Sequence, residues 1–500
     1  MPFAWLKNNL ILILILIFSI LLFTYKLGSI PPSLYADEAS EGYSAYSIWL
    51  TGKDEYGKTF PLLFRLFGAY TPPLYIYLSA PIVGLFGLTV FNIRLLSAIS
   101  GVISVLIFYL ILHKYLSNKL IIYFSTIVYS ILPWTVFNSR LGYEVMLAAT
   151  LFNIGIYFLL SKEHDYLGFL FLSLSTYTAH TQKFLVPIFL FFFLIYYKKI
   201  NLKNIGFLLL TQLPNLYLTT TAAFWSKSSG LSHYSLIQII SNFINQFVNY
   251  LSPYTLFFQP QDIDQQHLIP QIGLFFWWMV IPLVIGLKTA PKFLIFWLII
   301  SIVPASLSGD FISVQRALPL LFPLMIIISL GLRSFKPTLL VILSIYSFLL
   351  LYRSYFVLFP YEMTKAWNYG YSQLSQFIQQ NPDKKFLIDN TRNNGSYSLI
   401  LFNLKYSPRL YHLEISNYFR DNYYQVPPTS SSYSFNNLDF EPLLWPNVNC
   451  RYDFVVGDDL SISSEQAKDH QLTLIQTIST PSNQIALKIF SIPKDGKICR

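Results

Sequence analysis

The feature that most constrains this 500-residue chain is a series of long apolar runs, which begins with LILILILIFSILLFTY at positions 10–25. A helix needs roughly 20 apolar residues to cross a lipid bilayer. Runs near this length occur about eleven times, and we expect each to be a membrane-spanning helix. They lie at residues 9–26, 90–112, 120–137, 145–160, 166–179, 184–197, 205–222, 271–287, 293–307, 318–332 and 337–357. Only 12% of the residues are charged, against about 25% in soluble proteins, so the composition also indicates a polytopic membrane protein.

The distribution of lysine and arginine predicts how the chain is oriented. The short connections on the same side as the N-terminus contain eleven basic and two acidic residues, and such an excess marks the cytoplasmic side. We therefore expect a multi-pass plasma-membrane protein with a cytoplasmic N-terminus. Its first run is predicted to be an uncleaved anchor, because no small-residue cleavage site follows it. This topology accounts for the formal net charge of +10, and no basic cluster indicates a nucleic-acid partner.

The C-terminal part lies outside the cytoplasm if the number of spans is odd. The predicted fold is an all-α polytopic membrane domain at residues 1–358, with long outer loops at 27–89 and 223–270. Residues 359–500 carry helix and strand patterns around turns, which predicts a small extracytoplasmic α/β or α+β domain. Cys450 and Cys499 both fall in this domain, in a compartment where disulfides persist, and the sequence leaves a bridge and two free thiols open.

The stretch SLYADEASEGYSAYSIW places Asp37, Glu38 and Glu41 directly after the first span. Acids so near a membrane segment must be solvated, paired or used in chemistry. Helical spacing of apolar residues predicts a helix lying in the membrane interface with its apolar side down. These residues are Ala39, Tyr43, Tyr46 and Leu50. Asp37 and Glu38 would open this helix, with Asp37 as a favoured N-cap, and a helix start is also a rigid position for a catalytic acid. Glu41 lies one turn from Asp37 and would influence its pKa.

Further site candidates are ionisable residues on the outer loops. They are Arg94, Arg140, Glu144, His180, Lys183, His267 and Arg316. The cations among them suit phosphate oxygens, with anchoring of helix ends as the alternative for the arginines. Arg140 and Glu144 are four residues apart, so a local ion pair is a further alternative. No P-loop, G-x-G-x-x-G, G-x-S-x-G or H-E-x-x-H motif occurs. The spacing of the acids and histidines matches no known metal-ligand motif, and a divalent cation as cofactor is left open.

The order of these parts resembles the GT-C superfamily of glycosyltransferases, which use polyprenyl-phosphate sugars. Within it the chain is most similar to glycosyltransferase family 39, the protein O-mannosyltransferase-like group, and to the lipid A aminoarabinose transferases. The resemblance covers roughly residues 10–335. It rests on the segments YADEASEGYSAY, YTPPLYIYLSAPIVGLFGLTVFNIRLLSAISG, FNSRLGYEVMLAATLFNIGIYF, YLSPYTLFFQPQDIDQQHLIPQIGLFFWW and SVQRALPLLFPLMIIISLGL.

This resemblance implies an inverting transfer of a sugar from an undecaprenyl- or dolichyl-type phosphate to a protein, lipid or glycan acceptor outside the cytoplasm. Asp37 would act as general base and Glu38 as a second carboxylate. The donor phosphate would be held by four cations, namely Arg94, Arg140, Lys183 and Arg316. Glu41, Glu144, His180 and His267 are the remaining site candidates.

Two residues depart from the pattern of these relatives. The aminoarabinose branch has a lysine where this chain has Thr71, and family 39 often has a tyrosine where this chain has Ala317. Both differences concern the identity of the substrates more than the fold.

A lipid or polysaccharide transporter and a surface-polysaccharide ligase or polymerase are the alternative functions. A transporter should have polar residues inside its spans or a repeated topology, and neither is visible in the sequence. A ligase should have one dominant outer loop, whereas here the acids follow the first span directly. The sequence therefore favours the transferase.

Overall fold

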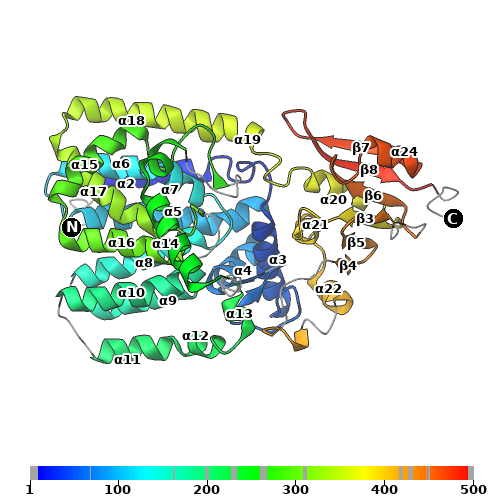
Figure 1. Cartoon of the computed structure of the whole chain (residues 1–500), viewed down its shortest axis with the longest axis horizontal. Helices are drawn as coiled ribbons and strands as arrows, with labels where there is room; N and C mark the ends of the chain where they lie inside the picture. Colours follow the sequence, from blue (N-terminus) through cyan, green and yellow to red (C-terminus); the bar gives the residue numbers. More distant parts are fainter. Residues whose placement is uncertain are drawn as a thin grey trace.

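The computed structural model describes residues 9–67, 69–161, 164–197, 202–226, 234–259, 267–307, 312–415, 420–425, 432–445, 448 and 451–493. A helical domain forms one end of the molecule and a smaller domain with a β-sheet forms the other (Figure 1). The two cysteines, Cys450 and Cys499, lie outside the described residues, so both a bridge and two free thiols stay open.

Helices occupy all eleven of the predicted apolar ranges. The main ones are α2 (Leu10–Thr24), α5 (Val90–Leu112), α6 (Lys119–Ile131), α8 (Val145–Ser161), α9 (Asp165–Thr176), α10 (His180–Tyr197), α11 (Leu202–Thr211), α15 (Val280–Thr289), α16 (Lys292–Ser306), α17 (Leu321–Gly331) and α18 (Pro337–Leu351). The shorter ones are α7 (Pro133–Asn138), α12 (Leu213–Leu218), α13 (Ala222–Trp225), η4 (Trp277–Met279), η5 (Leu318–Leu320), η6 (Leu332–Ser334) and η7 (Tyr352–Leu358), and α19 (Phe359–Glu362) follows the last range.

Three described helical segments are long and apolar enough to cross a membrane, namely Val90–Leu112, His180–Tyr197 and Pro337–Glu362. Several of the others are interrupted. Pro133, for example, separates α6 from α7, because a proline cannot continue the hydrogen-bond ladder of the preceding helix. The number of membrane crossings therefore stays a prediction.

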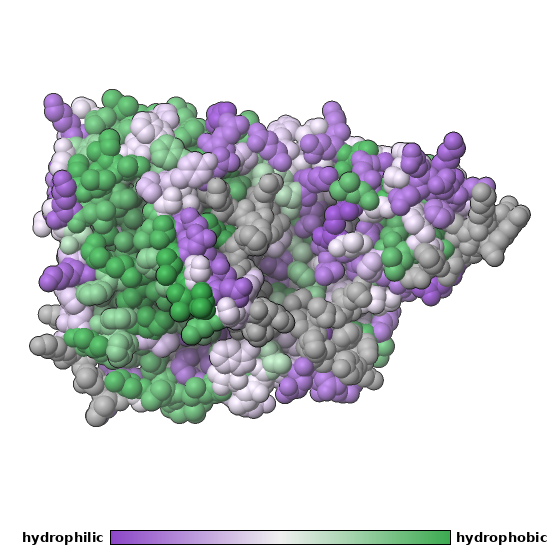
Figure 2. Space-filling view, viewed as in Figure 1, coloured by the Kyte–Doolittle hydropathy of each residue, from purple (hydrophilic) through white to green (hydrophobic). Residues whose placement is uncertain are grey.

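The surface of the helical domain agrees with burial in lipid. A broad apolar zone covers its middle, and hydrophilic residues gather at its far end and over the sheet domain (Figure 2). Inside, α15 and α17 approach backbone to backbone through two glycines. A Cβ atom on Gly286 would lie 1.9 Å from the Ile327 carbonyl oxygen, and one on Gly331 would lie 1.9 Å from that of Pro282. Such small-residue contacts are typical of helix packing in membranes.

The predicted first outer loop, residues 27–89, forms two helices, α3 (Ala36–Thr51) and α4 (Leu74–Phe86). The short strands β1 (Phe64–Arg65) and β2 (Tyr70–Thr71) lie between them in the sequence. Asp37 and Glu38 lie in the first turn of α3, as predicted. The predicted apolar side of α3 is covered by protein at Ala39 and Tyr43, and large apolar side chains are exposed near the end of the helix, at Trp49 and Leu50. Its place in the membrane interface stays a prediction. The N-cap residue is Tyr35, so the predicted capping role of Asp37 is wrong.

The C-terminal domain contains a six-stranded mixed sheet of order β4-β5-β3-β6-β8-β7. Its strands are β3 (Phe386–Asp389), β4 (Tyr433–Phe435), β5 (Leu438–Glu441), β6 (Phe454–Gly457), β7 (Thr473–Ser479) and β8 (Ile485–Ser491). Strand β3 runs parallel to β5 and β6, and the other pairs are antiparallel. Its helices are α20 (Tyr371–Gln380), α21 (Ser396–Leu404), α22 (Pro408–Glu414) and α24 (Ser464–Asp469).

Helix α21 docks this domain onto α3. A Cβ atom on Gly42 of α3 would lie 2.9 Å from the Phe402 ring, and the Tyr43 hydroxyl donates to the Tyr406 carbonyl at 3.0 Å. One apolar core, which includes Tyr43, Ile93, Leu399 and Phe402, passes through α3, α5 and α21. The start of α3 is therefore enclosed by both domains.

Candidate active site

The first turn of α3 is fixed by a buried ion pair between Glu38 and Arg94. Arg94 Nε donates to Glu38 Oε1 at 2.9 Å, and Nη2 donates to Oε2 at 2.8 Å, with both side chains 0% exposed. Glu38 also accepts the backbone N–H of Gly142 at 2.6 Å and that of Tyr35 at 3.1 Å. Bidentate pairs of this kind are both strong and geometrically specific. Glu38 thus joins α3 to α5 and to the turn before α8.

All five N–H groups of Arg94 are used within the protein. Besides its two bonds to Glu38, Nη1 donates to the carbonyls of Leu27 and Pro31 at 3.1 Å each, and Nη2 donates to that of Ser33 at 2.6 Å. The sequence offered two roles for Arg94, a phosphate ligand and an anchor of helix ends. Its geometry in the structure is that of an anchor.

Arg140 forms a second anchor of the same segment. Its Nη1 and Nη2 donate to four carbonyl oxygens at 2.7–3.0 Å, and its Nε donates to the Tyr355 hydroxyl at 3.3 Å. The carbonyls belong to Leu22, Phe23, Tyr25 and Ile30. A cation at the end of α2 also suits the helix dipole. The alternative of an ion pair between Arg140 and Glu144 is wrong, because every Arg140 donor is bound elsewhere.

Three acids, which we call the helix-start acids, gather beside this anchored turn: Asp37, Glu41 and Glu144. Asp37 is half-buried, whereas Glu41 is 2% exposed. Thr71 Oγ1 donates to Glu41 Oε1 at 3.4 Å, and the Glu41 Oε2 atom is buried without a donor among the described residues. Burial raises the pKa of Glu41 well above its ordinary value, and the negative charges of Glu144 and Asp37 raise it further.

The predicted site residues His180 and Lys183 lie at the start of α10, next to β2. The His180 ring nitrogen Nε2 is 2.8 Å from the carbonyl oxygen of Tyr70, which precedes Thr71. The Lys183 ammonium is buried, without a hydrogen-bond partner among the described residues, and lies 4.8 Å from the centre of the Phe224 ring. Lys183 thus lies one helical turn after the residue that contacts the backbone next to Thr71.

The remaining predicted residues are His267 and Arg316. His267 is buried, and its ring meets that of Tyr35 edge-on at 5.8 Å, just before Asp37. Arg316 is half-buried in the segment that leads into η5. Within the residues that the structure describes, no three histidine, cysteine or acidic side chains are arranged as a metal-ligand set.

The C-terminal domain forms one wall of the site, which the sequence did not predict. The loop after β3 reaches the first residue of α3, so a Cβ atom on Gly395 would lie 2.6 Å from Cβ of Ala36. Ser398 donates to the Ala36 carbonyl at 3.4 Å. Asn368 donates to the Leu34 carbonyl at 3.3 Å. Single polar residues and one glycine in loops carry no periodic signal, so only the fold reveals their position.

A second pair of buried acids, Asp54 and Glu55, was also missed. We call them the helix-end acids, because they follow the end of α3. Asp54 accepts the Tyr423 hydroxyl at 2.5 Å, and Glu55 accepts the hydroxyls of Tyr397 at 2.9 Å and Ser40 at 3.3 Å. Burial raises the pKa of Asp54 to about 7 and that of Glu55 to about 8. The sequence KDEYGK resembles a solvated turn and gave no signal of this burial.

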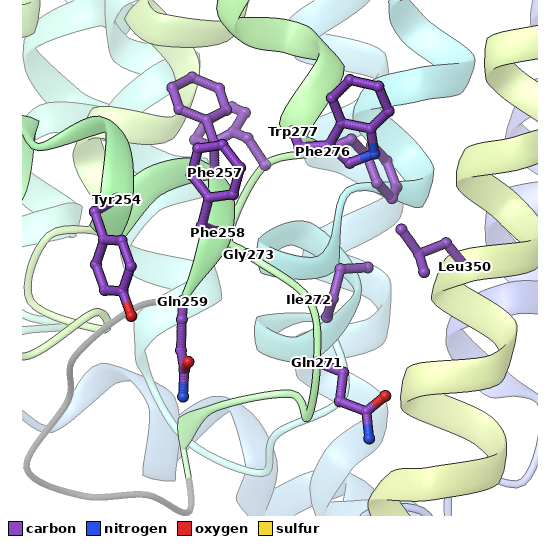
Figure 3. A pocket seen from close by; sticks show the side chains of 11 residues that line it. Tyr254, Phe257, Phe258, Gln259, Gln271, Ile272, Gly273, Phe276, Trp277 and Leu350 are labelled. Atoms are coloured by element: carbon purple, nitrogen blue, oxygen red, sulfur yellow. The ribbon is translucent and has the colours of Figure 1, made fainter.

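An aromatic cavity of about 280 Å³ lies between the end of the predicted outer loop 223–270 and α18 (Figure 3). Its walls include Tyr254 and Phe258 from η2 (Tyr254–Phe258), Trp277 from η4, and Leu350 from α18. Tyr254, Phe258 and Trp277 are each about half exposed, at 51%, 55% and 50%. Near one edge Arg353 donates to Gln271 at 2.7 Å, which places a cation by this apolar space.

Comparison with solved structures identifies the fold. ArnT from Cupriavidus metallidurans in the apo state matches with a TM-score of 0.56 and 10% sequence identity, over 96% of this chain and 97% of ArnT. The chain has the GT-C fold. ArnT bound to undecaprenyl phosphate gives a TM-score of 0.55 at 11% identity, over 96% of this chain and 98% of ArnT. No protein-family model and no curated protein sequence matches the chain.

A second relative in the GT-C fold is the archaeal oligosaccharyltransferase AglB from Archaeoglobus fulgidus, in complex with an inhibitory peptide and a dolichol-phosphate. It matches with a TM-score of 0.51 and 13% identity, over 99% of this chain and 76% of AglB. The predicted resemblance to the GT-C superfamily is confirmed at the level of the fold. The match to ArnT also extends well beyond residues 10–335, since it includes the C-terminal domain, and it agrees with the apolar helices in indicating a membrane protein.

Proposed function

We propose that this protein transfers a sugar from a polyprenyl-phosphate-sugar donor to an acceptor outside the cytoplasm, with inversion at the sugar carbon. The observation that carries the proposal is a half-buried Asp37 on a helix start that two buried arginines hold rigid, at the junction of the two domains. The fold adds support, since ArnT and AglB were solved with undecaprenyl phosphate and a dolichol-phosphate.

In the proposed reaction, an acceptor hydroxyl attacks the sugar carbon that bears the phosphate. The new C–O bond forms as the bond from that carbon to the phosphate oxygen breaks, and the polyprenyl phosphate leaves with the electron pair. Asp37 takes the hydroxyl proton as general base. The phosphate is a good leaving group, so one carboxylate suffices where a glycosidase needs two.

We assign the four predicted cations to two tasks. Arg94 and Arg140, whose donors are all bound to the protein, position the segment before α3, and Glu38 acts with them. Lys183 and Arg316 are the proposed ligands of the donor phosphate. Lys183 would take the role of the lysine that the aminoarabinose transferases have at the position of Thr71. His180 holds the backbone beside Thr71, and His267 supports Tyr35. A preorganised cation at a developing phosphate charge is among the largest catalytic effects.

The aromatic cavity beside α18 is the proposed binding site for the polyprenyl chain of the donor. Its lining is mostly aromatic and apolar, and Arg353 lies near one edge. With eleven crossings and a cytoplasmic N-terminus, the proposed site faces the extracytoplasmic side of the membrane, where the acceptor would be found.

A donor panel tests the proposal. Purified protein in lipid nanodiscs would be given radiolabelled undecaprenyl- and dolichyl-phosphate sugars together with a membrane extract as acceptor. We expect label to move from one donor to the acceptor fraction, with the opposite anomeric configuration by NMR. A retained configuration would contradict the single displacement, and no transfer from any donor would favour a transporter.

A further inference from the structure

A second cavity, of about 630 Å³, lies at the end of α5 that is remote from the candidate active site. It is bounded by the end of α5, the start of α6, the middle of α8 and the residue before α2. Three basic side chains and three phenol groups line it, namely His113, Lys114, Lys119, Tyr109, Tyr123 and Tyr157. No acidic side chain lines this cavity within the part of the chain that the structure describes. Such a set of donors and positive charges suits the oxygens of a phosphate group.

The geometry of α5 gives the position of this cavity in the membrane. Helix α5 is long and apolar enough to cross a bilayer. From Arg94, at the candidate active site, to His113 a helix that rises 1.5 Å per residue covers about 28 Å. The hydrocarbon core of a bilayer is about 30 Å thick. The cavity therefore lies at the level of the lipid head groups, on the side of the membrane that is predicted to be cytoplasmic.

The basic side chains of the connection between α5 and α6 are close enough to influence one another. Burial lowers the pKa of His113, and the positive charge of Lys119 lowers it further. A further cation lies at the same connection, since Arg333 Nη2 donates to the Tyr115 carbonyl at 2.7 Å. Basic pockets between membrane helices on the cytoplasmic side are typical of sites for anionic lipid head groups.

The border of the cavity favours a lipid over a soluble phosphate. Exposed apolar side chains directly follow two of its lining residues, Asn9 and Lys119. These side chains are Leu10, Ile11 and Leu120, each about half exposed. They belong to α2 and α6, which pack against each other. A ligand that has both a phosphate and acyl chains can thus contact the cations and an apolar surface at the same time.

We propose that this cavity binds the phosphate head group of an anionic phospholipid from the leaflet on the N-terminal side of the membrane. Lys114 and Lys119 contact the phosphate oxygens, and the phenol groups of Tyr123 and Tyr157 form the wall beside them. The Lys114 ammonium already lies 5.0 Å from the centre of the Tyr157 ring. The acyl chains lie along α2 and α6. This site is independent of the proposed function, because it is separated from Asp37 by most of the membrane.

Native mass spectrometry of the full-length protein in detergent tests the choice of ligand. Phosphatidylglycerol, phosphatidylcholine with the same acyl chains, and soluble glycerol phosphate would each be titrated. We expect phosphatidylglycerol to bind about 10-fold more tightly than the other two, because phosphatidylcholine has no net charge and glycerol phosphate has no acyl chains. Equal binding of phosphatidylcholine would overturn the role of the cations, and equal binding of glycerol phosphate would overturn the assignment to a lipid.

The double variant Lys114→Gln, Lys119→Gln tests the location of the site. We expect its affinity for phosphatidylglycerol to fall about 10-fold or more, since each lysine near an anionic head group contributes roughly fivefold. The matched control is Lys288→Gln, Lys292→Gln, which removes two exposed lysines from another connection predicted on the same side and should bind like the wild type. An unchanged affinity in the first variant, or an equal loss in both, would overturn the site.

Discussion

Helix α3 has buried acids near both ends, and the two groups differ in how their oxygens are satisfied. At the far end, Asp54 and Glu55 accept hydrogen bonds from tyrosine hydroxyls and, for Asp54, from the backbone N–H groups of Tyr56 and Lys58 at 3.0 and 2.8 Å. Near the start, Glu41 accepts one long hydrogen bond, from the Thr71 hydroxyl at 3.4 Å, and no donor among the described residues reaches its Oε2 atom. Fully bonded acids stabilise a domain contact, whereas acids short of donors are typical of a site that handles protons.

The largest expected effect concerns the buried pair that holds the helix start. Arg94→Met should lower the free energy of unfolding by about 3–5 kcal/mol, because Glu38 is then left as an unpaired buried charge. Heat unfolding of the purified protein in detergent would measure this loss. The exposed Arg409→Met is the matched control and should unfold like the wild type. Equal midpoints for the two variants would contradict the anchoring role.

The next effect concerns the wall that the C-terminal domain provides. Gly395→Val places a side chain where Ala36 and the Phe67 ring already lie, so the loop after β3 must move off the start of α3. We expect transfer activity to fall about 10-fold or more, since small displacements of a site are costly to catalysis. The control is Asn394→Val, at an exposed position of the same loop, which tests whether any valine there lowers activity. A similar loss of activity in this variant would contradict the proposed contact between the loop and the start of α3.

A smaller effect is the pH dependence of stability that we expect from the helix-end acids. Folding raises the pKa of Asp54 from 3.8 to about 7 and that of Glu55 from 4.5 to about 8. Between these values the folded state binds more protons than the unfolded state, so stability should fall as the pH rises through the window and level off above it. Glu55→Gln should flatten part of this slope in unfolding midpoints measured across the window. A slope unchanged from the wild type would show that Glu55 does not titrate there.

The smallest effect is expected for the exposed ion pair of Arg392 with Asp458 in the C-terminal domain. Surface pairs contribute about 0–1 kcal/mol, so Arg392→Gln should change the unfolding midpoint little and leave transfer intact. A loss of transfer with no loss of stability would instead assign Arg392 to the acceptor, and would extend the site further into the C-terminal domain.

The sequence predicted those features that depend on local patterns. Apolar length located the helices of the membrane domain, helical spacing located α3, and strand patterns around turns indicated the mixed C-terminal domain. The hairpin of β4 and β5 was missed, because its short strands follow a polar, serine-rich stretch. Features that depend on partners distant in sequence were not predictable. The burial of Ala39 and Tyr43 of α3 was not predicted, because the helix that covers them, α21, lies far away in the sequence.

The roles of the charged residues show the same limit. The sequence identified the acids after the first span and the arginines of the outer loops as unusual, and the structure brings Asp37, Glu38, Glu41, Arg94 and Glu144 together. It could not tell that Arg94 and Arg140 would bind backbone carbonyls, because those carbonyls carry no sequence signal. Nor could it separate Asp54 and Glu55 from solvated acids, since their burial depends on tyrosines of the C-terminal domain.

The most direct test of the central claim is single-turnover transfer by Asp37→Asn, measured with the donor that the panel identifies. Asparagine keeps the size of the side chain but cannot accept the proton, so we expect a rate loss of about 100-fold or more with an unchanged unfolding midpoint. Glu465→Gln, an exposed acid in α24, is the matched control and should transfer at the wild-type rate. Transfer by Asp37→Asn at the wild-type rate would contradict the account and direct the search for the base to Glu144.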